Sequence, residues 1–238
     1  MTADENPDTP NIKAIDVDAR RLHALMITGI VLPILLYPFL SMLIIPTGID
    51  PSLRLFISRL LIWATVGIMF LYARYGEVQN FFLWDEKQYN AGFYIKAIIG
   101  VYLLCFAAGY VASIPRLLGL HEDNTILVKT LMALKKYPAL MYFGAITAGI
   151  TEEFIFRGYI LSRLSALIKN KHIAVVLSAL LFAFIHIGYK TYHELLFAFL
   201  IGLVSGYYYQ KYRNIKVIIV VHFLIDIIAF VLFKAPHK

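Results

Sequence analysis

The sequence of 238 residues contains a single cysteine, Cys105. A lone cysteine excludes a disulfide bond within the chain and leaves no second thiol for a cysteine-based metal site. Because Cys105 stands inside an apolar run, we expect a small buried core residue there. The sequence also lacks the HExxH pattern of zinc peptidases, internal repeats and a stripe of basic residues. These absences argue against a disulfide-stapled fold and against a nucleic-acid-binding surface.

Apolar residues, in contrast, make up 60% of the chain, compared with about 45–50% in soluble domains. They gather in runs of about 20 residues, long enough to cross a bilayer core of roughly 30 Å. Backbone amides in lipid need partners within their own segment, so every span must be helical. We therefore predict an all-α membrane protein, a polytopic bundle of seven or eight transmembrane helices. The runs lie at 23–48, 54–75, 93–115, 138–161, 173–189, 193–210 and 215–233.

Four further features of the sequence complete the predicted layout. Residues 125–135, TILVKTLMALK, are short and amphipathic, which predicts an interfacial helix or an eighth membrane element. Residues 1–22 are polar and lack the basic start and apolar core of a signal peptide, so we expect a polar tail. The stretch GLVSG places Gly202 and Gly206 four residues apart, which predicts a close-packing helix face within or between chains. Most Lys and Arg residues lie near span ends, where lipid phosphates can neutralise them.

The stretch TEEFIFRGY, residues 151–159, places two glutamates and an arginine in an otherwise apolar helix. Charges at membrane depth cost a few kcal/mol each and tend to face the interior of a bundle. Glu153 and Arg157 are four residues apart, in the order that favours an ion pair. Glu152 points about 100° away around the helix and has no cation of its own. It suits a general base, although a structural ion pair beside a glutamate at a wet interface is the alternative.

Two later stretches place histidines at membrane depth. In LFAFIHIG, His186 shares a helix face with Phe182, and a hydrogen-bonded interfacial histidine is the structural alternative. In VVHFLIDII, His222 and Asp226 lie four residues apart, and a buried structural pair is the alternative. These groups come from different helices and could together activate water, with or without a metal ion. The deep ionisable residues that we identify all lie in the C-terminal half: Glu152, Glu153, Arg157, His186, His222 and Asp226.

The stretches EEFIFR, FAFIH and HFLID, in that order, resemble the three motifs of the CAAX protease and bacteriocin-processing family, also called the Abi family. The family pattern is E-E-x-x-x-R, then F-x-x-x-H, then H-x-x-x-N or Asp. The resemblance covers residues 138–233 and implies an intramembrane endopeptidase related to type 2 prenyl-protein proteases. It divides the chain into a tail at 1–22, N-terminal helices with an interfacial segment at 23–137, and a catalytic helical core at 138–233.

The resemblance implies a role for each motif residue. Glu152 would be the general base that activates water, with help from His186. Glu153 and Arg157 would form a structural ion pair. His222, together with the residue at position 226, would face the developing oxyanion.

Position 226 departs from the best-known pattern because it holds Asp instead of Asn. An ionised Asp cannot donate a hydrogen bond, so Asp226 either is protonated, or orients His222, or binds a metal. We favour the orienting role because the spacing places the carboxylate beside the imidazole. Family members have been called metalloproteases, and water activated by glutamate without a metal is an equal alternative. A zinc ion would take its ligands from Glu152, His186, His222 and Asp226.

Two other functions are compatible with buried carboxylates and histidines. An ion-coupled transporter would use them to relay protons, and a catalytically silent immunity or scaffold protein would bind a partner. The lack of inverted repeats argues against the first, and the complete motif set argues against the second. We expect a peptide or protein substrate at the membrane, prenylated or not, a lipid bilayer as surroundings and no nucleic acid. A short chain without a targeting segment favours a prokaryotic inner membrane, and the oligomeric state is left open.

The depths of the histidines impose a geometric condition. At about 1.5 Å per residue, His222 lies roughly 8–10 Å from the inner end of its span and His186 roughly 20 Å from the inner end of its own. The site assembles only if spans tilt, start at different levels or break. His193 and Glu194 stand at a predicted helix start, where we expect them to serve the helix terminus instead of a metal.

Overall fold

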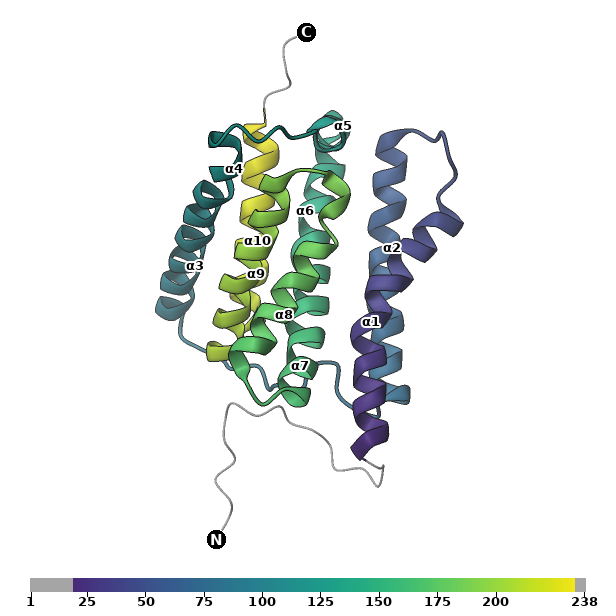
Figure 1. Cartoon of the computed structure of the whole chain (residues 1–238), viewed down its shortest axis with the longest axis vertical. Coiled ribbons are helices and arrows are strands. Elements are labelled where there is room, and N and C mark those ends of the chain that lie inside the picture. The colour runs from purple at the N-terminus through teal and green to yellow at the C-terminus, as the bar shows by residue number, and fades with distance from the viewer. Residues whose placement is uncertain (1–18, 234–238) are drawn as a thin grey trace.

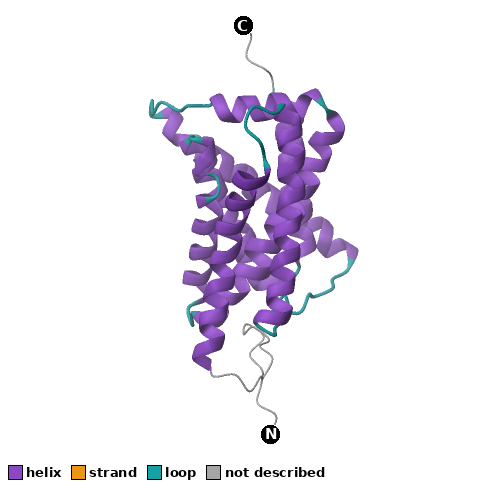
Figure 2. Ribbon diagram, turned by 90° about the vertical axis from the view of Figure 1, so that its right-hand side faces the viewer, coloured by secondary structure: helices purple, strands orange, loops and turns teal. Residues whose placement is uncertain are grey.

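The computed structural model describes residues 19–233, and all regular secondary structure in this range is helical (Figure 2). The first eighteen residues of the expected tail lie outside the described residues. The elements are α1 (Ala19–Ile44), α2 (Pro51–Leu71), the π-helix η1 (Tyr72–Gly76), α3 (Ala91–Ala112), α4 (Ile114–Leu117), α5 (Thr125–Lys136), α6 (Pro138–Glu153), the π-helix η2 (Phe154–Leu161), α7 (Ser162–Leu167), α8 (Lys171–Phe184), the 3₁₀ turn η3 (Ile187–Tyr189), α9 (Tyr192–Tyr212) and α10 (Ile215–Leu232).

Six of the described helical segments are long and apolar enough to cross a membrane. The predicted polytopic helical bundle is therefore confirmed. The seventh predicted span corresponds to α9, which is long enough at 21 residues but is less apolar than the six. The proposed eighth element, α5, has 12 residues and reaches only about 18 Å at roughly 1.5 Å per residue. It lies at the end of the bundle where α10 ends (Figure 1), as an interfacial helix would.

Helix starts and bends follow from local sequence. At the start of α2, the Asp50 carboxylate accepts hydrogen bonds from the backbone N–H groups of Ser52 (2.8 Å) and Leu53 (3.2 Å). Asn90 and Asn214 cap α3 and α10 in the same way. In α1, two prolines at positions 33 and 38 remove backbone donors, and the helix bends along its length (Figure 1).

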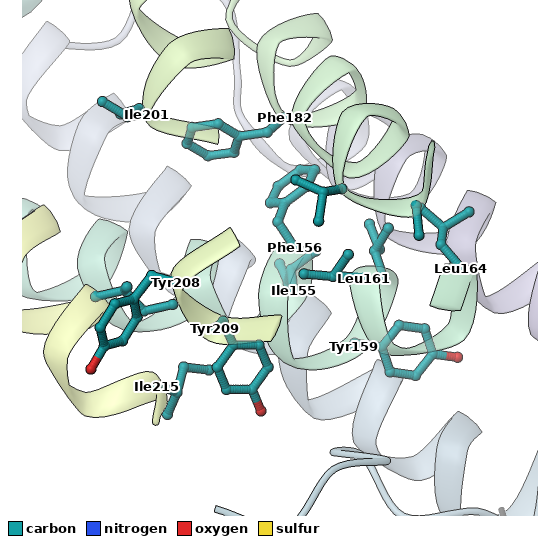
Figure 3. Packing of buried hydrophobic residues seen from close by; sticks show 14 of the residues in the cluster. Ile155, Phe156, Tyr159, Leu161, Leu164, Phe182, Ile201, Tyr208, Tyr209 and Ile215 are labelled. Carbon is teal, nitrogen blue, oxygen red and sulfur yellow. The ribbon is translucent and has the colours of Figure 1, made fainter. Parts of the chain in front are cut away.

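The continuous segment α6–η2–α7 forms the centre of the bundle. Its most apolar window is 61% buried, whereas the other five spans reach only 17–33%. It packs against α10 and α2 through α6, and against α8 through η2. Figure 3 shows Phe156 of η2 directed toward Phe182 of α8, with ring centroids 5.0 Å apart. The segment that carries the first motif is thus held on all sides by protein.

The two glycines of GLVSG lie where α9 crosses α8. A Cβ atom added at Gly202 would lie 2.9 Å from the Cβ of Ala179, and one at Gly206 would lie 3.0 Å from Val175 Cγ1. The predicted close-packing face therefore lies within the chain. It fixes α8 against α9 at backbone distance, just before α8 leads into the second motif.

A buried ion pair between Glu77 and Arg163 was not predicted. The Arg163 Nη2 to Glu77 Oε2 distance is 2.6 Å, and both side chains are fully buried. The Tyr159 hydroxyl donates to the second Glu77 oxygen at 2.7 Å. Arg163 also donates to the Phe81 and Asn80 carbonyls. The expectation that basic residues lie near lipid phosphates is thus wrong for Arg163, which ties the loop after η1 to α7.

Candidate active site

The first motif residues, Glu153 and Arg157, form an ion pair inside the bundle. Arg157 Nη1 lies 3.0 Å from Glu153 Oε1, and both side chains are almost fully buried. The guanidinium also stacks over the Phe182 ring, 4.4 Å from its centroid. The pair spans the point where α6 changes into the π-helix η2. The negative charge of Glu153 is therefore balanced by a side chain of the protein itself.

His222 of α10 is surrounded by three carboxylates. Its Nδ1 lies 2.8 Å from Glu153 Oε1, within hydrogen-bond distance. Its Nε2 lies 3.8 Å from Glu152 Oε2 and 4.0 Å from Asp226 Oδ2. Glu153 therefore orients the imidazole, which corrects our preference for Asp226 in that role. The reason is geometric: α6 packs against α10 and brings Glu153 to Nδ1, while Asp226 faces the opposite ring nitrogen at a distance too long for a direct bond.

His186 lies just beyond the end of a helix. Helix α8 ends at Phe184, and the chain turns through η3 before α9 begins. This break meets the geometric condition that the sequence imposed on the depth of His186. The Nδ1 atom is 2.8 Å from the Phe182 carbonyl oxygen, which can only accept a hydrogen bond. Nδ1 therefore carries a proton, and Nε2 of the neutral ring keeps its lone pair.

One cavity of about 120 Å³ brings these groups together. It is large enough to hold water molecules. Leucines of helix α5 form part of its wall. The candidate residues that line it are Glu152 from α6, His186 from the turn after α8, and His222 and Asp226 from α10. Glu153 and Arg157 stand behind this wall and do not line the cavity.

Comparison with protein families gives one match within the chain. Residues 135–228 match the family described as type II CAAX prenyl endopeptidase Rce1-like. This segment belongs to the CAAX protease and bacteriocin-processing family. The matched range runs from the end of α5 into α10, so it contains all three motifs and the cavity residues from Gly144 to Asp226. Comparisons with curated proteins and with solved structures gave no match to the chain.

Two further charged residues line the cavity, although the sequence analysis did not place either of them in the site. Arg59 reaches it from α2, which lies outside the matched segment, and Glu194 reaches it from the first turn of α9. Arg59 corrects the expectation that all deep ionisable residues lie in the C-terminal half. It could have been found as a charge in the middle of an apolar run. Glu194 was expected to serve only the helix terminus, because sequence alone does not show that the first turn of α9 borders the cavity.

The position of Glu194 depends on a carboxylate of the loop before α5, Glu122. The backbone N–H of His193 donates to Glu122 Oε1 at 2.8 Å, and Arg116 Nη2 lies 2.9 Å from Glu122 Oε2. Burial opposes ionisation, but these hydrogen bonds and the Arg116 charge lower the pKa of the Glu122 carboxyl. The Thr191 hydroxyl accepts from the next N–H, that of Glu194, at 3.1 Å. The start of α9 is thus held by two acceptors, which fixes the side chains that follow.

A metal ion fits the type of these side chains but not their placement. The described residues contain no group of three or more His, Cys, Asp or Glu side chains positioned to hold one ion. Ligand atoms of a tetrahedral zinc lie about 2.0–2.2 Å from the metal, and hence about 3.4 Å from each other. The His222 Nε2 distances of 3.8 and 4.0 Å to Glu152 and Asp226 exceed that separation. Zinc would require these side chains to move closer together.

A larger hollow of about 440 Å³ lies at the loop after η1 and lacks histidine in its lining. Glu86, one of its residues, accepts a hydrogen bond from the Ile215 N–H at 2.9 Å and thereby supports the start of α10. Burial raises the pKa of Glu86, and this hydrogen bond opposes the shift. The larger hollow therefore contains a structural carboxylate, and the smaller cavity is the candidate active site.

Proposed function

We propose that the chain is an intramembrane endopeptidase that hydrolyses a peptide bond with a water molecule activated by Glu152. The observation that carries this proposal is the different environment of two adjacent glutamates. Glu153 is occupied by Arg157 and His222, whereas Glu152 lines the cavity and has no hydrogen bond from the described residues. A carboxylate in a small polar cavity inside a membrane bundle suits general base catalysis. The family match supports a protease.

The proposed reaction needs one base and one stabiliser of negative charge. Glu152 removes a proton from water as the water oxygen attacks the peptide carbonyl carbon. The carbonyl oxygen becomes an oxyanion in a tetrahedral intermediate. Protonated Glu152 then gives its proton to the leaving amine as the C–N bond breaks. The products are a carboxylic acid and an amine, and the enzyme returns to its starting state.

In the proposed reaction, His186 holds the water and His222 stabilises the oxyanion. Nε2 of His186 is an acceptor, so it can hold the attacking water by accepting one of its hydrogens. Nε2 of His222 can donate only when the ring is protonated, because Nδ1 already carries the proton shared with Glu153. Three carboxylates within 4.0 Å favour that protonated ring. His222 is then the donor that stabilises the oxyanion.

The substrate that we propose is a membrane-associated peptide, with prenylated peptides as the first class to examine because of the family description. The setting is the plasma membrane of a prokaryote. A cleavage assay in detergent on matched prenylated and unmodified peptides tests the proposal. We expect Glu152→Gln to reduce kcat by roughly 10²–10⁴, the usual contribution of a general base. Wild-type turnover that survives Glu152→Gln would show that another group activates the water.

A chelator separates the proposed mechanism from metal catalysis. The proposed steps use side chains of this chain only, so EDTA should leave the rate of the wild-type protein unchanged. Loss of activity in EDTA, with rescue by added zinc, would instead assign a metal to Glu152, His186, His222 and Asp226. Solute uptake by proteoliposomes that depends on Glu152, without any peptide cleavage, would favour a transporter.

A further inference from the structure

The larger hollow of about 440 Å³ at the loop after η1 is not used by the proposed reaction. This loop joins two of the membrane-crossing segments, Pro51–Gly76 and Ala91–Leu117, and it runs along the end of the bundle where α1 begins (Figure 1). Loops between spans lie at the level of the lipid headgroups. The volume is within the range of roughly 300–1,000 Å³ that is usual for small-ligand sites. The hollow therefore has the size and the depth to receive part of a lipid.

The polar side chains that line the hollow carry charges of both signs. Arg74 comes from η1, and Asp85 and Glu86 come from the loop that follows. Arg74 and Asp85 are exposed, and within the described part of the chain neither forms an ion pair or a side-chain hydrogen bond. The guanidinium of Arg74 lies only over the ring of Tyr75, 5.9 Å from its centroid. A ligand that carries a negative and a positive group side by side would thus find a partner for each.

Most of the remaining wall is apolar. Phe70 of α2 is 55% exposed, and its ring stacks on that of Phe81 with centroids 6.1 Å apart. The apolar wall therefore continues from the loop onto the outer face of α2, which lipid chains cover in a membrane. The apolar residues of the lining are Val66, Phe70, Phe81, Phe82, Trp84 and Phe154. A ligand that fits both parts of the hollow is amphipathic, with a charged head and an apolar chain.

The hollow is separate from the active-site cavity, although both border the same central segment. None of the described residues lines both spaces. Phe154, which follows Glu153 directly, packs edge-on against the ring of Phe82, with centroids 5.1 Å apart. A Cβ atom added at Gly158 would lie only 2.2 Å from the same ring. A ligand in the hollow therefore rests against the outside of η2 and does not occupy the place of a substrate.

We propose that the larger hollow binds a zwitterionic phospholipid whose headgroup carries a primary ammonium, as an ethanolamine headgroup does. The phosphate lies against Arg74, because a planar guanidinium matches phosphate oxygens with two parallel hydrogen bonds. The ammonium, with its three N–H donors, lies against Asp85 and Glu86. One acyl chain follows the aromatic wall toward the outer face of α2. This site belongs to the N-terminal half of the chain except for Phe154.

Three phospholipids with identical acyl chains test this proposal on the full chain in detergent. Native mass spectrometry gives the Kd of each complex. We expect phosphatidylethanolamine to bind more tightly than phosphatidylcholine and phosphatidylglycerol by roughly 10- to 100-fold, as for hydrogen bonds between charged groups. Phosphatidylcholine has the same net charge but no N–H donor, and phosphatidylglycerol has no cation.

Two variants examine the two charges separately. Arg74→Gln should weaken the binding of phosphatidylethanolamine by roughly 10- to 100-fold. Asp85→Asn should weaken phosphatidylethanolamine but not phosphatidylglycerol. Both side chains are exposed, so the Tm without lipid should stay at the wild-type value. Arg21→Gln is the matched control, because Arg21 is an exposed arginine at the start of α1, at the same end of the bundle, and does not line the hollow.

Three outcomes overturn the proposal. Equal binding of the three lipids would show that the headgroup is not recognised. Tightest binding of phosphatidylglycerol, weakened by Arg21→Gln as much as by Arg74→Gln, would indicate a general attraction of this end of the bundle for anions. Unchanged binding of phosphatidylethanolamine by Arg74→Gln would place the lipid elsewhere on the protein.

The test does not depend on the proposed function, because binding is measured without a peptide. Glu152→Gln should bind phosphatidylethanolamine as tightly as the wild type, since Glu152 does not line the hollow. Loss of lipid binding in this variant would place the lipid in the active-site cavity and overturn the proposal. The same binding preference in a protein that cleaves no peptide would support the lipid site and contradict only the proposed peptidase.

Discussion

At the scale of single residues, the site depends on two adjacent glutamates whose surroundings differ. Glu153 contacts a guanidinium and an imidazole, and it is 1% exposed. Glu152 is 8% exposed and lines a cavity. The first carboxylate contacts His222 and Arg157, and the second is the base in the proposed reaction. The same residue type therefore serves two roles because the helix turns by about 100° between them.

Replacing each glutamate separately distinguishes these roles. Glu153→Gln leaves Arg157 buried without its counter-ion, which costs about 3–5 kcal/mol when one partner of a buried pair is removed. Glu152→Gln breaks no ion pair with Arg157, so we expect a change in unfolding free energy within about 1 kcal/mol. Thermal or denaturant unfolding in detergent gives both values. Equal destabilisation by the two variants would contradict the division of roles.

Asp226→Asn tests the residue that departs from the family pattern. Glu153 still holds Nδ1 of His222 in this variant, so stability should stay within about 1 kcal/mol of the wild type. One of the three carboxylates that favour the protonated ring is lost, so kcat should fall by roughly 10-fold, equal to about 1.4 kcal/mol. Unfolding measurements and cleavage rates on one peptide give both quantities. Complete loss of activity would mean that Asp226 contacts the substrate or a metal.

At the scale of helices, the α8–α9 crossing determines where the second motif lies. Gly202 contacts Ala179 at backbone distance, and α8 ends five residues later, next to His186. Gly202→Ala should lower the unfolding free energy by about 1–3 kcal/mol because neither backbone can withdraw easily. Gly100→Ala is the control, since a Cβ there meets open space and the substitution favours the helix by up to about 1 kcal/mol.

Unfolding curves for the two variants in one detergent provide the measurement. Unchanged stability of Gly202→Ala would show that the two helices can separate without cost. Destabilisation by both variants would show that glycine is needed for helix flexibility instead of for close packing.

Some of the helices could be predicted from the sequence, and others could not. The apolar runs predicted the spans, because length and hydropathy alone decide whether a helix can cross a bilayer. The end of α8 before His186 was not predictable, since IHIGYK continues the apolar pattern up to a lysine. The π-helix after Glu153 was also missed, because its wider turn depends on packing between α6, α8 and α10. Local sequence therefore located the motifs, and tertiary contacts set their relative positions.

At the scale of the whole molecule, one buried ion pair links the two halves of the chain. Glu77 belongs to the loop after η1, and Arg163 belongs to α7. Arg163→Met leaves the Glu77 carboxylate buried without a cation, so we expect a loss of about 3–5 kcal/mol of unfolding free energy. The double variant Glu77→Gln/Arg163→Met leaves no buried charge and should lose less than the single variant.

An ion-paired arginine at the surface is the matched control. Arg116, whose side chain is 56% exposed, pairs with Glu122, whose carboxylate keeps the hydrogen bond from the His193 N–H when the arginine is removed. Arg116→Met should therefore be far milder than Arg163→Met in the same unfolding experiment. A double variant as unstable as Arg163→Met would show that the packing of the arginine stem, and not its charge, holds the halves together.

The Glu77–Arg163 ion pair and the place of Arg59 in the cavity were not predicted, because each depends on residues far away in the sequence. Glu77 and Arg163 are separated by more than eighty residues, so their spacing carries no helical periodicity. Arg59 was similarly visible only as an isolated charge, because its cavity is built from α2, α5, α6, α9 and α10. Glu153 and Arg157, in contrast, are four residues apart on one helix, and sequence spacing alone brings them together.

The charges of the central helix also bear on how the protein enters the membrane during translation. The segment Pro138–Leu167 has a mean hydropathy of 1.2, whereas the other five spans have values of 1.9–2.7. Each charged residue near a helix centre opposes insertion from the translocon by roughly 2.5–3.5 kcal/mol. The partners of these charges come from both sides in the chain: the Glu77 loop leaves the ribosome earlier, and His222 leaves it later. We therefore expect this helix to enter lipid only after α10 has been synthesised, as the last span to become stably integrated.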